Sequence, residues 1–244
     1  MSTETSTTSN KVISNVTPRD HSITTSQLAG RFSLITSAAT LILLATLHIL
    51  SPEFDPSWRM VSEYALGSYS WILSLMFLAW GLSSWVLAFA LWSQLQTRAA
   101  KIGLIFLVLA GLGEAMASIF DIRHPLHSTA GLIGIPCLPI AAMLISMSLS
   151  RMEEWSVAKK ALLWTANLTW FSVLLLIGTF VLMIITYTQS GASVEPNAAV
   201  KVLPDGVIGL VGWANRFLVV VYCVWAMTVA WLAGKMPWSY PNNH

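Results

Sequence analysis

Two charged residues, Glu114 and Arg216, stand inside long apolar stretches of this 244-residue chain. Glu114 interrupts the stretch from Ile102 to Phe120, and Arg216 interrupts the stretch from Val207 to Gly234. Charged side chains at bilayer depth are costly, so they usually face protein or water and find a partner. Helical rise places Glu114 about 10 Å below Asp121, and Arg216 about 14 Å below the outer end of its stretch. The matching depths predict a hydrogen-bonded Glu114–Arg216 pair.

This predicted pair has two interpretations. It is either a structural clamp that fixes the register of two helices, or part of a functional site that lines a path for a substrate or an ion. Asn215 and Trp213 would extend the polar patch around Arg216. Gly111 and Gly113 would let a neighbouring helix come close to Glu114, because small residues allow close approach of helix backbones.

A second group of polar residues lies in the turn between the third and fourth apolar stretches. Asp121, His124 and His127 have side chains of the kind that bind zinc, through carboxylate oxygen and imidazole nitrogen. His48, at the end of the first stretch, would supply a third histidine if that stretch packs beside the turn. The alternative is a solvated turn in which Pro125 opens the next helix and His124 caps it. Zinc is therefore the cofactor that the pattern suggests, and the plain turn needs none.

The segment before the second stretch carries Ser62 and Glu63. Ser62 is placed to cap the second helix, with Glu63 in its first turn, where a carboxylate complements the helix dipole. In the alternative interpretation, Glu63 joins Asp121 and the histidines around an outward-facing cavity. The candidate polar site consists of Glu63, Glu114, Asp121, Asn215 and Arg216, and the candidate metal ligands are His48, His124 and His127.

Six apolar stretches must position these groups. A hydrocarbon core of ~30 Å needs about 20 apolar residues in a helix, and lipid offers no partner to backbone groups outside a helix or a closed barrel. The stretches are much longer than barrel strands. We predict spanning helices at Phe32–Leu50, Tyr69–Trp92, Ile102–Phe120, His127–Leu149, Ala161–Thr186 and Val207–Gly234. The fold class is therefore all-α, a six-helix membrane bundle over residues 32–236, with a disordered polar tail at 1–31 and a short tail at 237–244.

Composition supports a membrane protein and excludes other classes. Only 10% of the residues are charged and 55% are hydrophobic, whereas a soluble domain has roughly 25% charged residues. The net charge of +2 comes without a basic run, so a nucleic-acid partner is not expected and the predicted partner is the lipid membrane. Cys137 and Cys223 both lie in apolar stretches, where free thiols are expected rather than a disulfide.

The distribution of basic residues predicts the orientation. An even number of spans places both termini on one side. That side carries nine basic residues: Lys11, Arg19, Arg31, Arg98, Lys101, Arg151, Lys159, Lys160 and Lys235. The other side carries Arg59, Arg123 and Lys201. Cytoplasmic loops carry the excess of Lys and Arg, so both termini are predicted to be cytoplasmic.

One segment has a pattern seen in a known family. A Pro/Asp loop is followed at residues 62–71 by Ser-Glu-Tyr-Ala-Leu-Gly-Ser-Tyr-Ser-Trp, and the chain then resembles the uncharacterised prokaryotic membrane family called domain of unknown function 998. The resemblance covers about residues 32–234. It implies that Asp121 is the aspartate of the turn between helices three and four, and that Arg216 is the polar position of the last helix. It also implies a prokaryotic cytoplasmic (inner) membrane, but no reaction.

A fainter resemblance is to the membrane hydrolases that include alkaline ceramidases and progestin/adiponectin-type receptors. Those proteins combine a serine, an aspartate and three histidines around zinc, and Ser62, Asp121, His48, His124 and His127 lie on the corresponding side here.

Three functions follow as alternatives. One is binding of a small molecule or lipid head group in the outer half of the bundle, another is zinc-dependent hydrolysis of a lipid-type substrate, and the last is transport gated by the Glu114–Arg216 pair. Whether the protein is an enzyme stays open.

Overall fold

The computed structural model describes residues 25–191 and 202–235, which form six long α-helices and two short 3-10 helices. The long helices are α1 (Thr25–Leu50), α2 (Ser70–Leu91), α3 (Arg98–Ile119), α4 (Pro125–Leu149), α5 (Lys159–Gln189) and α6 (Val211–Lys235). The short ones are η1 (Val61–Leu66) and η2 (Glu153–Ala158). Six helices are long and apolar enough to cross a membrane. The predicted all-α six-span architecture is confirmed, and the protein is a multi-pass membrane protein.

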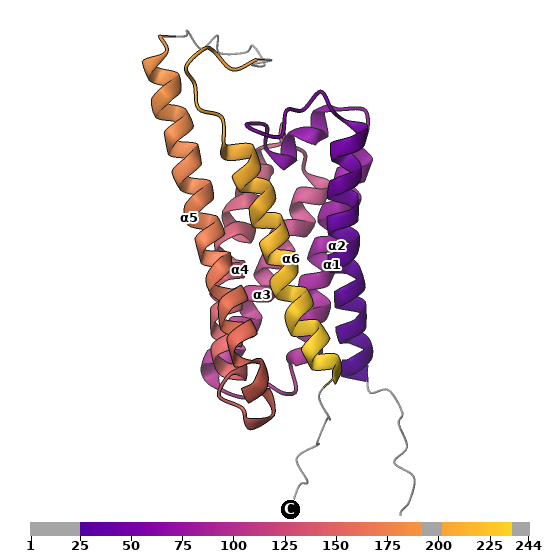
Figure 1. Ribbon diagram of the computed structural model, residues 1–244. Coiled ribbons are helices and arrows are strands. Elements are labelled where there is room, and N and C mark those ends of the chain that lie inside the picture. The colour runs from indigo at the N-terminus through magenta and orange to yellow at the C-terminus, as the bar shows by residue number, and fades with distance from the viewer. Residues whose placement is uncertain (1–24, 192–201, 236–244) are drawn as a thin grey trace, which may run out of the picture.

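The helices form a closed ring in chain order. Each long helix packs on its chain neighbours, and α6 closes the ring by packing on α1. Helix α6 also touches α2 and α4, and it has the largest buried share of the six. Figure 1 shows that α1 begins and α6 ends at the same end of the bundle. The opposite end, which carries η1 and the turn between α3 and α4, is called the distal end below.

The predicted starts of α1, α3 and α6 need correction, and α3 begins at Arg98 rather than Ile102. Helix α1 begins at Thr25, so residues 25–31 are helical and not part of a disordered tail. The reason is packing: Ala29 and Gly30 are buried, and a Cβ on Gly30 would lie 3.3 Å from the carbonyl oxygen of Ala230 in α6. The rest of the predicted tails, residues 1–24 and 237–244, lies outside the described residues. Helix α6 begins at Val211 rather than Val207.

The cap predicted for the second helix is wrong. Helix α2 begins at Ser70, whereas Ser62 lies in the separate helix η1. The chain breaks between them at Gly67, which packs so closely on the Phe54 ring that a Cβ there would lie 2.8 Å from a ring carbon. The break turns η1 across the distal end of the bundle.

Candidate ligand-binding site

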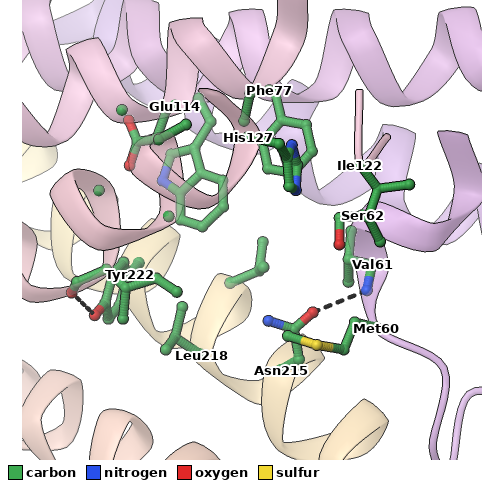
Figure 2. A pocket seen from close by; sticks show the side chains of 18 of the residues that line it. Met60, Val61, Ser62, Phe77, Glu114, Ile122, His127, Asn215, Leu218 and Tyr222 are labelled. Atoms are coloured by element: carbon green, nitrogen blue, oxygen red, sulfur yellow. Dashed lines mark hydrogen bonds between the residues drawn. The ribbon is translucent and has the colours of Figure 1, made fainter. Parts of the chain in front are cut away.

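A cavity of about 290 Å³ lies in the distal half of the bundle, between η1, α2, α3, α4 and α6 (Figure 2). Its wall is mainly apolar. The side chains with polar groups on the wall are Ser62, Trp80, Glu114, His127, Ser128, Asn215 and Tyr222. The cavity thus brings Glu114 and Asn215 of the predicted site onto one wall, together with His127. The other members of the predicted site, Glu63, Asp121 and Arg216, are not among the lining residues.

Glycines draw α3 against α4 beside the cavity. A Cβ on Gly113 would lie 2.5 Å from the backbone nitrogen of Gly134, so a larger residue would force the two helices to shift at this crossing. Gly111 is equally constrained, because its Cβ would lie 2.6 Å from the Trp85 ring of α2. The predicted role of Gly111 and Gly113 in close helix approach near Glu114 is confirmed. Gly131, by contrast, lines the cavity, and the nearest atom to a Cβ there would be 4.0 Å away.

A proline in α4 accounts for the hydrogen bond between Tyr222 and Ile135 at the inner end of the cavity. Pro139 lacks the N–H that would bond the carbonyl of Ile135 one turn earlier. The hydroxyl of Tyr222, from α6, donates to that Ile135 oxygen at 2.6 Å. Buried carbonyls need a donor, so this bond replaces the one that the proline removes. Tyr222 was not among the predicted site residues, although Pro139 inside a span indicated that a carbonyl needed a partner.

Glu114 is buried on the cavity wall with one carboxylate oxygen unpaired. The residue is 5% exposed. Ser84 of α2 donates to Oε2 of Glu114 at 2.8 Å. The other oxygen, Oε1, is buried and accepts no hydrogen bond within the described part of the chain. Leaving a buried acceptor unsatisfied costs about 1–3 kcal/mol, and more for a charged group.

The predicted Glu114–Arg216 pair is wrong. Helix α3 packs mainly on α2 and α4, whereas α6 packs mainly on α1 and α5, so similar depth in the bundle does not bring the two side chains together. No salt bridge joins Glu114 to a cation among the residues that the structure describes. A transporter gate built on this pair has no structural basis.

Arg216 instead connects α6 to α1 and to the segment leading into η1. Its Nε donates to Nε2 of His48 at 2.8 Å, and Nη2 donates to the hydroxyl of Tyr64 at 3.0 Å. Its Nη1 donates to the carbonyl oxygens of Arg59 at 2.5 Å and Gly212 at 3.0 Å. Neutral acceptors therefore take up the guanidinium donors, and the residue is only 4% exposed. Arg216 has a structural role at the distal end.

Asn215, the neighbour of Arg216, presents its amide to both η1 and the cavity. Its Oδ1 accepts from the backbone nitrogen of Val61 at 2.9 Å, which fixes the oxygen toward η1. The Nδ2 group then turns away from Val61, as Figure 2 shows, and it has no partner among the described residues. Asn215 is 9% exposed and lines the cavity. It therefore offers a hydrogen-bond donor inside a largely apolar space.

The two remaining carboxylates of the predicted site have local partners. Glu63 accepts from the Arg59 side chain at 2.5 Å and from the backbone nitrogen of Met60 at 2.8 Å, which caps η1. Asp121 accepts from the Arg123 side chain at 2.7 Å and from its backbone nitrogen at 2.9 Å. The Arg123 side chain, and then its N–H, hold the pKa of Asp121 below its usual range. Neither group joins Glu114, so the predicted five-residue cluster divides into separate contacts.

The three histidines predicted as metal ligands do not converge. His48 accepts from Arg216, and His124 caps α4 by accepting from the backbone nitrogen of Leu126 at 3.2 Å. His127 bonds the carbonyl oxygen of Phe120 through Nδ1 at 2.8 Å. Within residues 25–191 and 202–235, no group of three or more His, Cys, Asp and Glu side chains is placed to hold a metal ion. The predicted metal site is wrong because each imidazole serves a different local contact, and the capping alternative for His124 is confirmed.

The site also contains aromatic residues that the sequence analysis did not identify. Phe77 and Trp80 of α2 stack with ring centroids 6.2 Å apart and an angle of 8°. The ring of Tyr222 meets Trp80 edge-on at 6.0 Å. All three line the cavity, and Ala117 of α3 completes this part of its wall beside Glu114. The arrangement combines an apolar space, a carboxyl group, an amide donor and aromatic rings, which is the chemistry of a binding pocket.

Comparison with known proteins adds a family but no activity. No curated protein and no solved structure matches the chain. The family described as protein of unknown function (DUF998) matches residues 34–232, which confirms the resemblance seen in the sequence, and the chain belongs to that family.

Proposed function

We propose that this membrane protein binds a small, largely apolar molecule in the distal cavity, with the polar end of the molecule at the η1 side. The observation that carries the proposal is a cavity of about 290 Å³ whose wall includes the buried, half-satisfied carboxyl group of Glu114. Ligand pockets usually have volumes of about 300 Å³ or more, mostly apolar walls and a few convergent polar groups. The cavity lies at the small end of that range.

The polar groups near η1 suit a ligand with a polar group on that side of the cavity. The hydroxyl groups of Ser62 and Ser128 form no hydrogen bond with the described residues, and both residues line the cavity. Asn215 adds its Nδ2 donor. If Nδ1 of His127 carries the proton donated to Phe120, its Nε2 is an acceptor on the same wall. These groups would orient a bound molecule. They would replace the hydrogen bonds that its polar end forms with water.

The side of the membrane is part of the proposal. Nine basic residues on the side of the termini against three on the distal side favour a cytoplasmic location for both termini, in the cytoplasmic membrane of a prokaryote. The cavity would then open on the outer side. A membrane-impermeant maleimide should label Arg123→Cys in intact cells and Glu154→Cys only after lysis. The reverse pattern would place the cavity on the inner side.

Binding can be tested with neutral alcohols of graded size, from cyclohexanol to octanol and 1-adamantanol. The protein would be placed in phosphatidylcholine nanodiscs, and binding measured by equilibrium dialysis with empty nanodiscs subtracted. We expect saturable binding of at least one alcohol. Gly131→Leu should abolish it, because the leucine side chain would extend into the cavity space that now surrounds Gly131.

The matched control is Gly178→Leu. Gly178 also lies within a long helix, a Cβ there would meet no atom within 4 Å, and it does not line the cavity. This variant should keep wild-type binding, and thermal melting should verify that both variants are folded. Absence of saturable binding by the wild type, or equal binding by Gly131→Leu, would refute the proposed function.

A further inference from the structure

We propose that the ligand of the distal cavity is an organic cation with a largely apolar body. Its ammonium group is bound by Glu114 and the aromatic rings of Phe77, Trp80 and Tyr222, on the side of the cavity away from η1. This inference rests on the proposed binding function and names the chemical class of the ligand.

The carboxyl group of Glu114 has one oxygen without a hydrogen-bond partner among the described residues. Ser84 provides one hydrogen bond to Glu114, and Oε1 has none. Burying an ionised carboxylate alone is far more costly than burying a neutral polar group, so a cationic partner would stabilise the ionised form. The terminal torsion of a glutamate is broad, so a small rotation is sufficient to turn Oε1 toward a ligand. The carboxyl group is therefore suited to receive N–H donors.

The described part of the chain supplies no cation to this carboxyl group. The residues that line the cavity include no lysine or arginine. Arg216, the nearest candidate by sequence reasoning, donates to His48, Tyr64 and two backbone carbonyls. Since none of the described residues places a positive charge at Glu114, a cation there would come from a molecule that enters the cavity.

The aromatic residues favour a cationic ligand independently of the carboxyl group. Phe77, Trp80 and Tyr222 line the same cavity as Glu114, and their rings contact one another in stacked and edge-on geometries. The face of an aromatic ring attracts a cation, tryptophan most strongly, and such rings form the cages that recognise organic ammonium groups. An anion gains nothing from these ring faces, and the adjacent carboxylate repels it.

The test uses three probes with one apolar cage and different head groups: 1-adamantanamine, 1-adamantanol and adamantane-1-carboxylate. Binding would be measured in zwitterionic phosphatidylcholine nanodiscs, with empty nanodiscs subtracted, because an anionic bilayer would itself attract the amine. We expect the wild type to bind the amine about tenfold or more tightly than the alcohol, since a desolvated cation–π contact and a charge-assisted hydrogen bond each contribute at that level. The carboxylate should bind least.

Glu114→Gln should lower the ratio of amine to alcohol affinity by about tenfold, because it removes the charge-assisted hydrogen bond and leaves the aromatic rings in place. Glu154→Gln, an exposed glutamate in η2, is the matched control and should keep the preference for the amine. Phe77→Leu provides a second variant if Glu114→Gln does not fold, and it should lower the ratio of amine to alcohol affinity while the cavity stays apolar. The ratio is measured within each variant, so general loss of stability does not mimic the effect.

The outcomes separate the two proposals. Equal binding of amine and alcohol by the wild type, tighter binding of the carboxylate, or a ratio of amine to alcohol affinity that is undiminished in Glu114→Gln would overturn the inference and leave the binding function intact. Failure of every probe to bind saturably would overturn the binding function, and the inference with it.

Discussion

Replacing Arg216 with leucine should destabilise the protein by about 3–5 kcal/mol. The change removes three hydrogen bonds from α6 to other segments: to His48 of α1, to the Arg59 carbonyl and to Tyr64 of η1. A hydrogen bond to a charged group contributes about 1.5–3 kcal/mol, and part of that gain is offset because a buried arginine no longer has to be desolvated. The estimate is a large share of the 5–15 kcal/mol that usually stabilises a folded protein.

The assay is reversible unfolding by sodium dodecyl sulfate in mixed micelles, applied to single and double variants. His48→Ala combined with Arg216→Leu should show a coupling of about 0.5–3 kcal/mol, because the two side chains share a hydrogen bond. Glu114→Gln combined with Arg216→Leu should be additive to within about 0.5 kcal/mol, because the two side chains share no partner. Arg216→Lys should also destabilise, since an ammonium group cannot reproduce the fork of the guanidinium.

Two results would refute this reasoning about Arg216. A cost below about 1 kcal/mol for Arg216→Leu would show that its hydrogen bonds do not hold the distal segment. A double variant of Glu114→Gln and Arg216→Leu more stable than Arg216→Leu alone would show that the two charges interact after all.

Two further predictions concern helix packing near the cavity. Gly113→Ala should cost about 1–3 kcal/mol, because its Cβ would lie 2.5 Å from the Gly134 nitrogen, whereas Gly134→Ala should be nearly neutral, because its Cβ meets the nearest atom at 3.7 Å. Equal effects in the same unfolding assay would contradict this asymmetry. Tyr222→Phe should cost about 1–3 kcal/mol by leaving the Ile135 carbonyl unsatisfied. That cost should shrink in a Pro139→Ala background, where residue 139 regains the N–H that bonds Ile135, and an unchanged cost would disprove the proposed replacement of the helix bond.

The spans were predictable from sequence because lipid imposes one solution on a long apolar segment. Backbone groups inside the bilayer must bond within a helix, so each apolar stretch becomes one element. The ends were less predictable, because they depend on tertiary contacts. Thr25–Arg31 continues α1 since its residues pack on α6, and α6 starts late since residues 202–210 form an irregular segment beside α5 and the η1 loop.

The composition of the site was only partly predictable, and the reason is geometric. Helical rise gives the depth of a residue, and the depths of Glu114 and Arg216 were estimated in this way. It gives neither the rotation of each helix nor the order of helices around the ring. Glu114 turns toward Ser84 and the cavity, and Arg216 turns toward His48 and Tyr64. His48 was predicted at the correct end of the bundle, but its role as an acceptor for Arg216 depends on that rotation.

The separation of the two charges gives them different roles. Arg216 uses its donors on acceptors of the protein itself, and this fixes the segment before η1 over the distal end of α6. Had Arg216 paired with Glu114, both charges would be satisfied internally, and the cavity would offer a ligand no charged group. Because Arg216 is held elsewhere, Glu114 lines a cavity with aromatic rings and keeps a buried oxygen that has no hydrogen-bond partner among the described residues. A buried unpaired carboxyl group is unfavourable in the free protein. A cation that pairs with it removes this cost, and the free energy regained strengthens binding.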